Sequence, residues 1–471
     1  MLKYDRSSPK SILEFARLLI QHKLSDFLPE EYTERFWKWE LWQLIEEHYF
    51  KKPLDNNSGA DFPEAWVELK ATPLIRLKRG EIRAKERLVL GIINYHEIVN
   101  ESWENSHFLA KNSLLLLIFY FYNRNELSVD HIIEIVELFS FLDYSDDATI
   151  IKNDWLKIQK KILDWKAHEL SEGDTDYLGA CTKGATALTS LRGQPMSEIL
   201  AKQRALSFKQ SYVNFILKRM RGESQRYESL FSGRKGKYIS IEERVQELFA
   251  PYLWKTAHDL WEHFKLNYTG QKNFCALLTN RILKVSSAEN VEEFLKANIK
   301  AKTIRVSSTW TLKEDISFPA FKFNELIQEN WEESELLDML ESTKFLFVIF
   351  RITLKNTSAF DNLSKAEQAK YLVLEKIALW NAPEWDIDTY GRDTWEKTVS
   401  TLKNGVILKR VDRKNDYIIK NNLPASTETE MIHIRPHWSD RDDVDILPDG
   451  RTLTKQCFWF NKKYIANQLG L

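Results

Sequence analysis

The stretch Asp61-Phe-Pro-Glu-Ala-Trp-Val-Glu68-Leu-Lys70 sets an acidic residue seven positions before a Glu-Leu-Lys triplet in an apolar, β-prone run. Successive side chains on a strand point to opposite faces, so Glu68 and Lys70 share one face while Val67 and Leu69 point into the core. If Asp61 ends a neighbouring strand, its carboxylate meets that of Glu68, and the pair can bind a hard cation that prefers oxygen ligands. Lys70 would then lie beside an attacking water. Because charged residues are frequent in this chain, the spacing alone also fits a surface ion pair.

The length and composition indicate a globular protein with more than one domain. The chain has 471 residues, too many for one ordinary core, and 43% of them are hydrophobic and 13% aromatic. The formal net charge of -1 gives no overall attraction to nucleic acid, but the charge is unevenly distributed. Between residues 183 and 221, one acid, Glu198, stands among eight basic residues: Lys183, Arg192, Lys202, Arg204, Lys209, Lys218, Arg219 and Arg221. This stretch fits either a solvated helix face or a surface that binds phosphate.

Cysteine usage and hydropathy indicate a cytoplasmic protein. Cys181, Cys275 and Cys457 are far apart and odd in number, so the sequence has neither a disulfide framework nor zinc spacing. Residues 1–25 carry early charges and no long apolar core, which argues against a secretory signal. The longest apolar run, residues 114–122, is far shorter than the roughly 20 residues that span a bilayer, and it predicts a buried strand. We therefore expect no membrane association.

Helical and strand patterns alternate over the first 220 residues. Ser8-Pro9 is typical of a helix start, and apolar residues follow it at helical spacing. A second predicted helix, from about Glu31 to Tyr49, delivers Glu46 just before the opening stretch. Strands are predicted at residues 66–72, 88–95 and 114–122, a strand running into a loop at 177–184, and helices at 128–141, 150–170 and 207–221. This interleaving predicts a mixed α/β or α+β domain.

The second half of the chain repeats the first in a degraded form. Trp103-Glu-Asn-Ser-His-Phe-Leu109 has a counterpart in Trp331-Glu-Glu-Ser-Glu-Leu-Leu337, at an offset of 228 residues. Glu68-Leu-Lys70-Ala corresponds to Asn298-Ile-Lys300-Ala, at an offset of 230 residues. Because these anchors keep their order along the chain, we interpret it as a tandem duplication with an insertion near residues 380–425.

Together, Asp61, Glu68-Leu-Lys70, the run from Trp103 to Lys111 and the loop at Lys183 resemble the MutH family over nearly the whole chain. This family comprises a mismatch-repair strand-nicking endonuclease, which is a single copy, and restriction enzymes with a second, degenerate copy. The resemblance is greatest to Sau-three-A type restriction endonucleases, through Ala167-His-Glu-Leu-Ser-Glu-Gly173, the Cys-Thr-Lys-Gly-Ala run and the doubled length. It implies a PD-(D/E)xK restriction-endonuclease-like (MutH-like) fold, tandemly duplicated, with Mg²⁺ dependence and double-strand cleavage at 5'-GATC.

The resemblance also implies roles for individual residues near the opening stretch. Asp61 and Glu68 would be the metal ligands, and Lys70 the group that orients or activates water. These three groups meet the needs of phosphodiester hydrolysis, in which a cation lowers the pKa of water and clamps the phosphate. Glu46 falls where the family has an additional active-site carboxylate, although the adjacent Glu47 is an alternative. Lys111 falls where the family has a second lysine.

The resemblance places DNA recognition on the loop after residue 177. Lys183, followed by Gly184, occupies the place of a base-contacting lysine. Cys181-Thr182 stands where the repair enzyme has Arg-Pro, and Ser207 lies near a tyrosine linked there to sensing adenine methylation, so the resemblance implies no particular response to methylation. We expect base readout and phosphate positioning to be divided among the basic residues of this region: Lys183, Arg192, Lys202, Arg204 and Lys209. His107 and His168, beside apolar residues, are predicted to be structural.

Residues 240–471, which follow a predicted linker at 223–239, lack the carboxylates of the first domain at 1–222. Val291 falls opposite Asp61, Asn298 opposite Glu68 and Thr279 opposite Glu46, whereas Lys300 remains. We therefore predict that the second domain does no chemistry and instead binds DNA or restrains the first domain. Its candidate DNA contacts are Arg435 and His437, the latter opposite Lys183.

These observations predict a cytoplasmic type II restriction endonuclease that acts on double-stranded DNA beside a cognate DNA methyltransferase, with no stable complex between them. Cutting of two strands by one active site predicts a transient DNA-bridged dimer. Two alternatives remain open. A repair-type nicking endonuclease would share the same site, and a non-catalytic DNA-binding protein would use the carboxylates in ion pairs.

Overall fold

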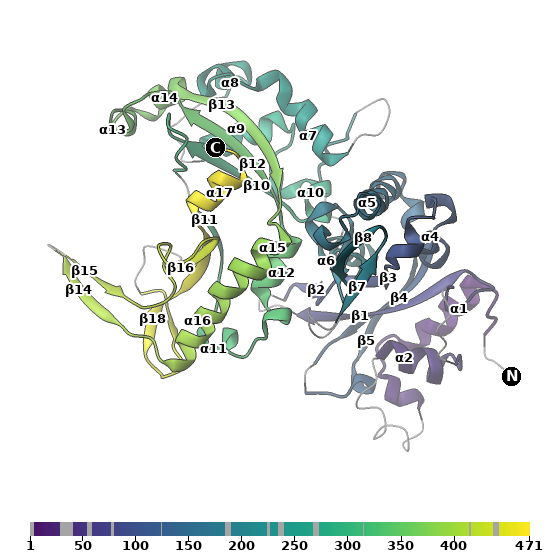
Figure 1. Cartoon of the computed structure of the whole chain (residues 1–471). Helices are drawn as coiled ribbons and strands as arrows, with labels where there is room; N and C mark the ends of the chain where they lie inside the picture. The colour runs from purple at the N-terminus through teal and green to yellow at the C-terminus, as the bar shows by residue number, and fades with distance from the viewer. Residues whose placement is uncertain are drawn as a thin grey trace. The chain divides into compact units, whose positions relative to one another are not determined.

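The computed structural model describes residues 4–28, 41–53, 59–76, 80–123, 125–183, 190–223, 227–233, 240–266, 273–313, 315–413, 416–436 and 442–471. The chain divides into two compact units, the first comprising Met1–Arg226 with Leu295–Ala297 and the second Tyr227–Phe294 with Asn298–Leu471 (Figure 1). This division lies inside the predicted linker. Within the described ranges, no helix combines the length and the hydropathy that crossing a bilayer requires.

A four-stranded sheet forms the centre of the first unit. Its order is β2-β1-β4-β5, with β1 (Val67–Arg76) parallel to β4 (Leu114–Phe121), and with β2 (Ile82–Ala84) and β5 (Ile133–Phe139) antiparallel at the two edges. Val67 and Leu69 point into a core shared with β4 and with helices α1 (Pro9–Ala16) and α2 (Leu41–Leu44), as the alternation predicts. The opposite face of β1 is thus left for Glu68 and Lys70.

A second sheet of the first unit has the order β3-β9-β6 and is antiparallel throughout. The carboxylate of Asp154 accepts backbone N–H bonds from Asp176, Tyr177 and Leu178, and so fixes the start of β6. The remaining strands and helices are β3 (Leu88–Ile92), β6 (Leu178–Thr182), the hairpin β7 (Leu191–Gln194) and β8 (Ser197–Lys202), β9 (Arg204–Phe208), α3 (Tyr95–Ile98), α4 (His107–Asn112), α5 (Ser145–Leu163) and α6 (Gln210–Met220).

Several predicted elements of this unit are confirmed and one is wrong in type. Ser8 caps α1 by accepting a hydrogen bond from the Ser11 N–H, and the apolar run at 114–122 forms strand β4. The helix predicted at 128–141 is wrong, because this segment forms strand β5. Strand β5 is buried at every third residue, a spacing that imitates a helix.

Helix boundaries also differ from the predictions. Helix α5 begins five residues before the predicted start and ends at Leu163, just before Trp165 takes up a left-handed conformation with φ 65°. The helix predicted from residue 207 begins at Gln210, since Ser207 still belongs to β9. Residues 31–40 of the second predicted helix lie outside the described ranges, and its described end consists of α2 and a π-helical turn at Ile45–Tyr49.

The second unit contains two three-stranded sheets, ordered β10-β12-β13 and β11-β19-β16. Their strands are β10 (Ile299–Val306), β11 (Ile316–Ala320), β12 (Lys344–Ile352), β13 (Leu372–Trp380), β16 (Ile432–Pro436) and β19 (Gln456–Phe460), with hairpins β14 (Lys409–Arg413)–β15 (Asp416–Lys420) and β17 (Val444–Ile446)–β18 (Thr452–Thr454). Its helices are α7 (Ile241–Phe249), α8 (Ala257–His263), α9 (Phe274–Ile282), α10 (Glu292–Lys296, divided between the units), α11 (Phe323–Leu326), α12 (Glu335–Ser342), α13 (Thr357–Asp361), α14 (Lys365–Gln368), α15 (Glu384–Asp386), α16 (Arg392–Asn404) and α17 (Lys462–Gln468).

The two units share their strand order and strand directions. Strands β1-β4-β5 match β10-β12-β13, and β3-β9-β6 match β11-β19-β16, each pair of neighbours running in the same sense. Even the register agrees, since Leu69 pairs with Leu116 in one unit and Ile299 with Lys344 in the other. These pairs differ by the offsets of 230 and 228 that the sequence repeat predicts.

Candidate active site

A short closed loop brings Asp61 and Glu68 together. The sequence analysis had instead expected Asp61 to lie at the end of a neighbouring strand. Phe62 and Val67 form an isolated bridge, with the Phe62 N–H donating to the Val67 carbonyl at 2.8 Å. The Asp61 N–H then donates to Glu68 Oε2 at 3.1 Å, and the Leu69 N–H donates to Asp61 Oδ2 at 2.8 Å. Local chain geometry therefore fixes the distance between the two acidic residues.

Two lysines converge on the other oxygen of Glu68. Lys70, two residues along β1, donates from Nζ to Glu68 Oε1 at 2.7 Å. Lys111, on helix α4, has its Nζ 3.4 Å from the same oxygen. The structure thus gathers Asp61, Glu68, Lys70 and Lys111, all of which the sequence singled out, at one end of β1.

Burial dominates the electrostatics of Glu68, which is only 2% exposed. Removal from water raises the pKa of its carboxyl group, and the nearby charge of Asp61 adds to this rise while Lys70 and Lys111 oppose it. The net result is a pKa of about 7. Because the negative charge of this buried carboxylate is energetically costly, a cation that reaches it stabilises the charged form. The donor chemistry of Asp61 and Glu68, two adjacent carboxylates, therefore suits a hard divalent ion.

Glu46 joins this cluster through a lysine that sequence reasoning missed. Lys52 Nζ forms an ion pair with Glu46 Oε1 and lies 3.8 Å from Asp61 Oδ1. Glu47, the alternative, instead has its carboxylate 3.8 Å from His48 Nε2, so the π-helical turn directs Glu46 to the site. The only sequence signal for Lys52 was its position six residues after Glu46. Across the described residues, no group of three or more carboxylate, His or Cys side chains is already gathered as a metal site.

The Trp103-to-Lys111 motif builds the helix that presents Lys111. The Ser106 hydroxyl caps α4 by accepting from the Leu109 N–H at 3.1 Å, and donates to the Trp103 carbonyl at 2.8 Å. Glu101 accepts from the His107 N–H at 3.3 Å and pairs with the His107 ring, raising the pKa of that imidazole. His107 is thus part of the support of α4, in line with the structural role predicted for it.

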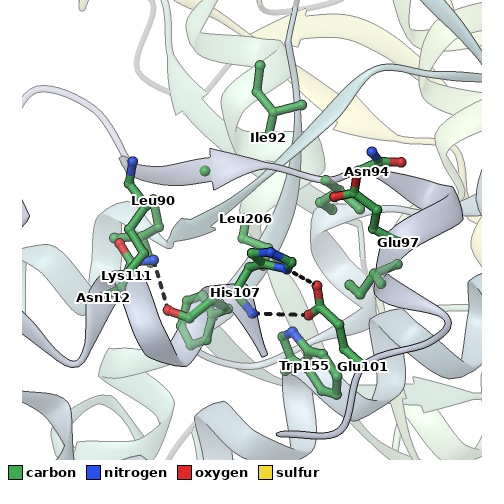
Figure 2. Close-up of a pocket in the computed structure, with 14 residues that line it drawn as sticks. Leu90, Ile92, Asn94, Glu97, Glu101, His107, Lys111, Asn112, Trp155 and Leu206 are labelled. Atoms are coloured by element: carbon green, nitrogen blue, oxygen red, sulfur yellow. Dashed lines mark hydrogen bonds and ion pairs between the residues drawn. The ribbon is translucent and has the colours of Figure 1, made fainter. Parts of the chain in front are cut away.

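A cavity of about 200 Å³ borders this helix (Figure 2). Figure 2 shows Lys111 and Asn112 from α4 on one side, and the Glu101–His107 pair on the other. Its walls also include Leu90, Trp155 and Leu206. The cavity therefore reaches the active-site cluster through Lys111.

Three of the residues predicted to bind DNA lie where they can reach a ligand. Lys183 is exposed at the end of β6, Arg192 is exposed on β7, and Lys202 is partly exposed on β8. Arg192 donates to the Gln203 side chain at 2.7 Å, which couples the hairpin to the strand that follows it. Gly184 and His437 lie outside the described residues.

Arg204 and Lys209 are not placed as the sequence analysis expected. Arg204 is 3% exposed and donates to the Ala180 carbonyl at 2.6 Å, while Lys209 is 1% exposed and donates to the Thr175 carbonyl at 2.7 Å. From inside the unit, Arg204 ties β9 to β6, and Lys209 holds the segment that precedes β6. We therefore remove them from the predicted DNA-binding set, because a run of basic residues in a sequence does not show which of them are buried.

The second unit keeps the framework of the site without its acids. Asn298 precedes β10 and donates to the hydroxyls of Ser342 and Thr343, and Val291 is fully buried. Lys300, opposite Lys70, is exposed. Arg435 has its guanidinium 2.9 Å from Asp315 and over the ring of Trp459, with about half of its side chain accessible.

A buried glutamate at the start of a parallel strand, a lysine two positions further on, and an aspartate held against the glutamate by a short loop are typical of a nuclease of the PD-(D/E)xK restriction-endonuclease-like class. The family described as "DNA mismatch repair enzyme MutH" matches residues 50–154, which include Asp61, Glu68, Lys70 and Lys111. The type II restriction enzyme Sau3AI of Staphylococcus aureus is 37% identical to this chain over 459 residues, which cover 90% of this chain and 91% of that relative. The chain belongs to the MutH family, among its type II restriction enzymes, and is a type II site-specific deoxyribonuclease.

Proposed function

We propose that residues 1–222 cleave both strands of DNA at 5'-GATC with Mg²⁺, and that residues 240–471 form a catalytically inactive domain that binds DNA or regulates the first. The observation that carries this proposal is a difference at equivalent positions: the first unit has the cluster of Asp61, Glu68 and Lys70, whereas the second has Val291, Asn298 and Lys300. A framework with only a lysine cannot hold a divalent ion.

Each side chain of the cluster has a distinct task. Asp61 and Glu68 would hold Mg²⁺, and the ion would supply charge relief to the phosphate and a lower pKa for the attacking water. Lys70, already 2.7 Å from Glu68 Oε1, orients that water or accepts its proton. Lys111 adds positive charge on the side of the scissile phosphate, where negative charge grows during the reaction.

DNA would be held by exposed cations near the ends of β6, β7 and β8. Lys183 is the proposed base contact, with guanine as its partner because guanine offers two acceptors in the major groove. Arg192 and Lys202 would position phosphates. In the second unit Arg435, held above Trp459, and His437 are the proposed contacts.

Double-strand cleavage by one site needs either two chains on one target or two successive nicks. We propose a transient dimer bridged by DNA, in which the inactive domain holds another copy of the site. A cognate DNA methyltransferase would protect host DNA without a stable complex, and the enzyme would act in the cytoplasm. Sedimentation that finds one chain per DNA during complete double-strand cleavage would contradict the dimer.

The deciding experiment digests plasmid DNA with and without Mg²⁺, using the wild-type protein and Glu68→Ala, and sequences the fragment ends. We expect linear fragments that end at 5'-GATC with Mg²⁺ and wild-type protein only. Persistent cutting by Glu68→Ala would overturn the proposed site. Nicked circles on hemimethylated DNA would instead support the repair-type endonuclease. Equal activity on unmethylated and fully adenine-methylated duplexes would exclude it.

A further inference from the structure

Lys52 contacts the carboxylates of the proposed active site, but none of the roles proposed above is assigned to it. Its ammonium pairs with Glu46 and lies 3.8 Å from Asp61, and its side chain is only 13% exposed. A buried ammonium is stable only with anionic or hydrogen-bonding partners, and here two carboxylates supply them. Lys52 therefore stands between two of the three acidic residues of the site.

We propose that Lys52 is an internal counter-ion that occupies the position between Glu46 and Asp61 and competes with the divalent cation there. This inference rests on the proposed function, because it assumes that Asp61 helps to hold Mg²⁺. In the ion-free protein, the ammonium keeps the two carboxylates close and compensates their charge. When a divalent ion binds, the ammonium must withdraw, and this withdrawal weakens the affinity for the ion.

The second unit supplies an independent observation. In each unit, the helix that corresponds to this region is followed, two residues after its end, by a left-handed residue, Lys51 with φ 55° and Lys284 with φ 60°. Alignment on these two residues places Val285 opposite Lys52 and Thr279 opposite Glu46. Lys300, by contrast, persists opposite Lys70 although its carboxylate partner is gone. Lys52 is thus absent where the carboxylates are absent, as is Lys111, which has Met339 as its counterpart at the offset of 228, and as expected for a counter-ion of those carboxylates.

The arrangement predicts how charge removal changes ion binding. A unit positive charge a few ångströms from a divalent ion, even at the dielectric constant of water, lowers the affinity by about tenfold. Lys52→Met keeps the length of the side chain and removes this charge. It should therefore bind Mg²⁺ about tenfold more tightly than the wild type.

Isothermal titration of the full chain with Mg²⁺ in the absence of DNA measures this affinity directly. Lys51→Met is the matched control, because Lys51 is the adjacent, exposed lysine and loses the same charge. Lys52→Arg keeps the charge. We expect Lys52→Met to bind Mg²⁺ more tightly than the wild type. Lys52→Gln should do the same, and it serves as a second variant if Lys52→Met fails to fold. The two controls, Lys51→Met and Lys52→Arg, should bind Mg²⁺ with affinities within about twofold of the wild type.

Thermal unfolding gives a second readout that does not depend on cleavage. Without a divalent ion, Lys52→Met leaves Glu46 and Asp61 uncompensated and should melt below the wild type, and saturating Mg²⁺ should raise its Tm by more than it raises that of the wild type. Equal or weaker Mg²⁺ binding by Lys52→Met, or equal tightening by Lys51→Met, overturns the inference. If the wild type cleaves with Mg²⁺ under those conditions, only this inference fails; if it neither binds Mg²⁺ nor cleaves with it, the proposed function fails as well.

Discussion

The two units of this chain have matching sheets and different sites. In the first, Glu68 opens β1, is buried, and meets Asp61, Lys70 and Lys111. In the second, Asn298 takes the equivalent position before β10 and uses its amide to hold two hydroxyls. The strand order and register survive this exchange. The framework therefore does not depend on the residues of the proposed site.

The largest expected difference between the units is in cleavage. Glu68→Ala removes a proposed metal ligand and should lower the cleavage rate by about a thousandfold or more. Lys300→Ala, at the position opposite Lys70, should leave the rate within about twofold of the wild type, because the second unit has no carboxylates to act with it. Single-turnover cleavage of a duplex with one 5'-GATC site measures both. A comparable loss in the two variants would show that the second unit takes part in the chemistry.

A second contrast concerns stability. The pKa of Glu68 is raised to about 7, so its neutral form is favoured in the folded state. The cost of its charge is therefore absent below the ordinary pKa of about 4.5, grows as the pH rises, and is fully present above about pH 7. In EDTA at pH 8, Glu68→Gln should be more stable than the wild type by about 2 kcal/mol.

Urea unfolding at two pH values checks this prediction. At pH 5 the stability difference between Glu68→Gln and the wild type should shrink, because Glu68 is then largely protonated in the folded protein. A difference that stays constant from pH 5 to pH 8 would show that Glu68 is not the group that titrates.

The Asn298 side chain should stabilise the folded protein, whereas charged Glu68 should destabilise it. Its side chain makes two hydrogen bonds, and its φ of 51° suits asparagine better than most residues. Asn298→Ala should lower the free energy of unfolding by about 1–2 kcal/mol and leave cleavage unchanged. Asn298→Gly keeps the backbone freedom but loses the hydrogen bonds, so a smaller loss in this variant separates the two causes. Stabilisation by Asn298→Ala would refute the proposed role of the side chain.

The smallest expected contrast comes from the two helix caps. Ser106 and Ser334 make the same pair of hydrogen bonds at the starts of α4 and α12. Replacing either by Ala should cost about 1 kcal/mol of stability. Only Ser106→Ala should also slow cleavage, by several-fold, because α4 carries Lys111. An equal effect of both variants on cleavage, measured under the same single-turnover conditions, would mean that the positioning of Lys111 does not depend on this cap.

Sequence reasoning found the parts of the site that follow from local patterns. The alternation of a strand places Glu68 and Lys70 on one face, and the apolar run at 114–122 can only be buried. The Trp103-to-Lys111 motif carries its own cap, so its counterpart in the second unit was recognisable as well. The four residues that the sequence analysis placed at the active site, Asp61, Glu68, Lys70 and Lys111, do meet in the structure.

What escaped prediction depends on tertiary contacts. Lys52 is defined by Glu46 and Asp61, whose approach is visible only in the folded chain. Arg204 and Lys209 look like surface cations until their buried carbonyl partners are known. Strand β5 was mistaken for a helix because it is buried at every third residue, a spacing close to the helical period.

The closed loop between Phe62 and Val67 has a consequence for the history of such proteins. It joins two acidic residues seven positions apart through a single bridge, so the pair is assembled within residues 61–69 rather than by distant parts of the fold. A duplicated gene segment can therefore lose the pair by one or two point mutations without losing the strands on either side. The second half of this chain, with Val291 and Asn298 at these positions, has the same strand order without the acidic pair, as such a loss would leave it.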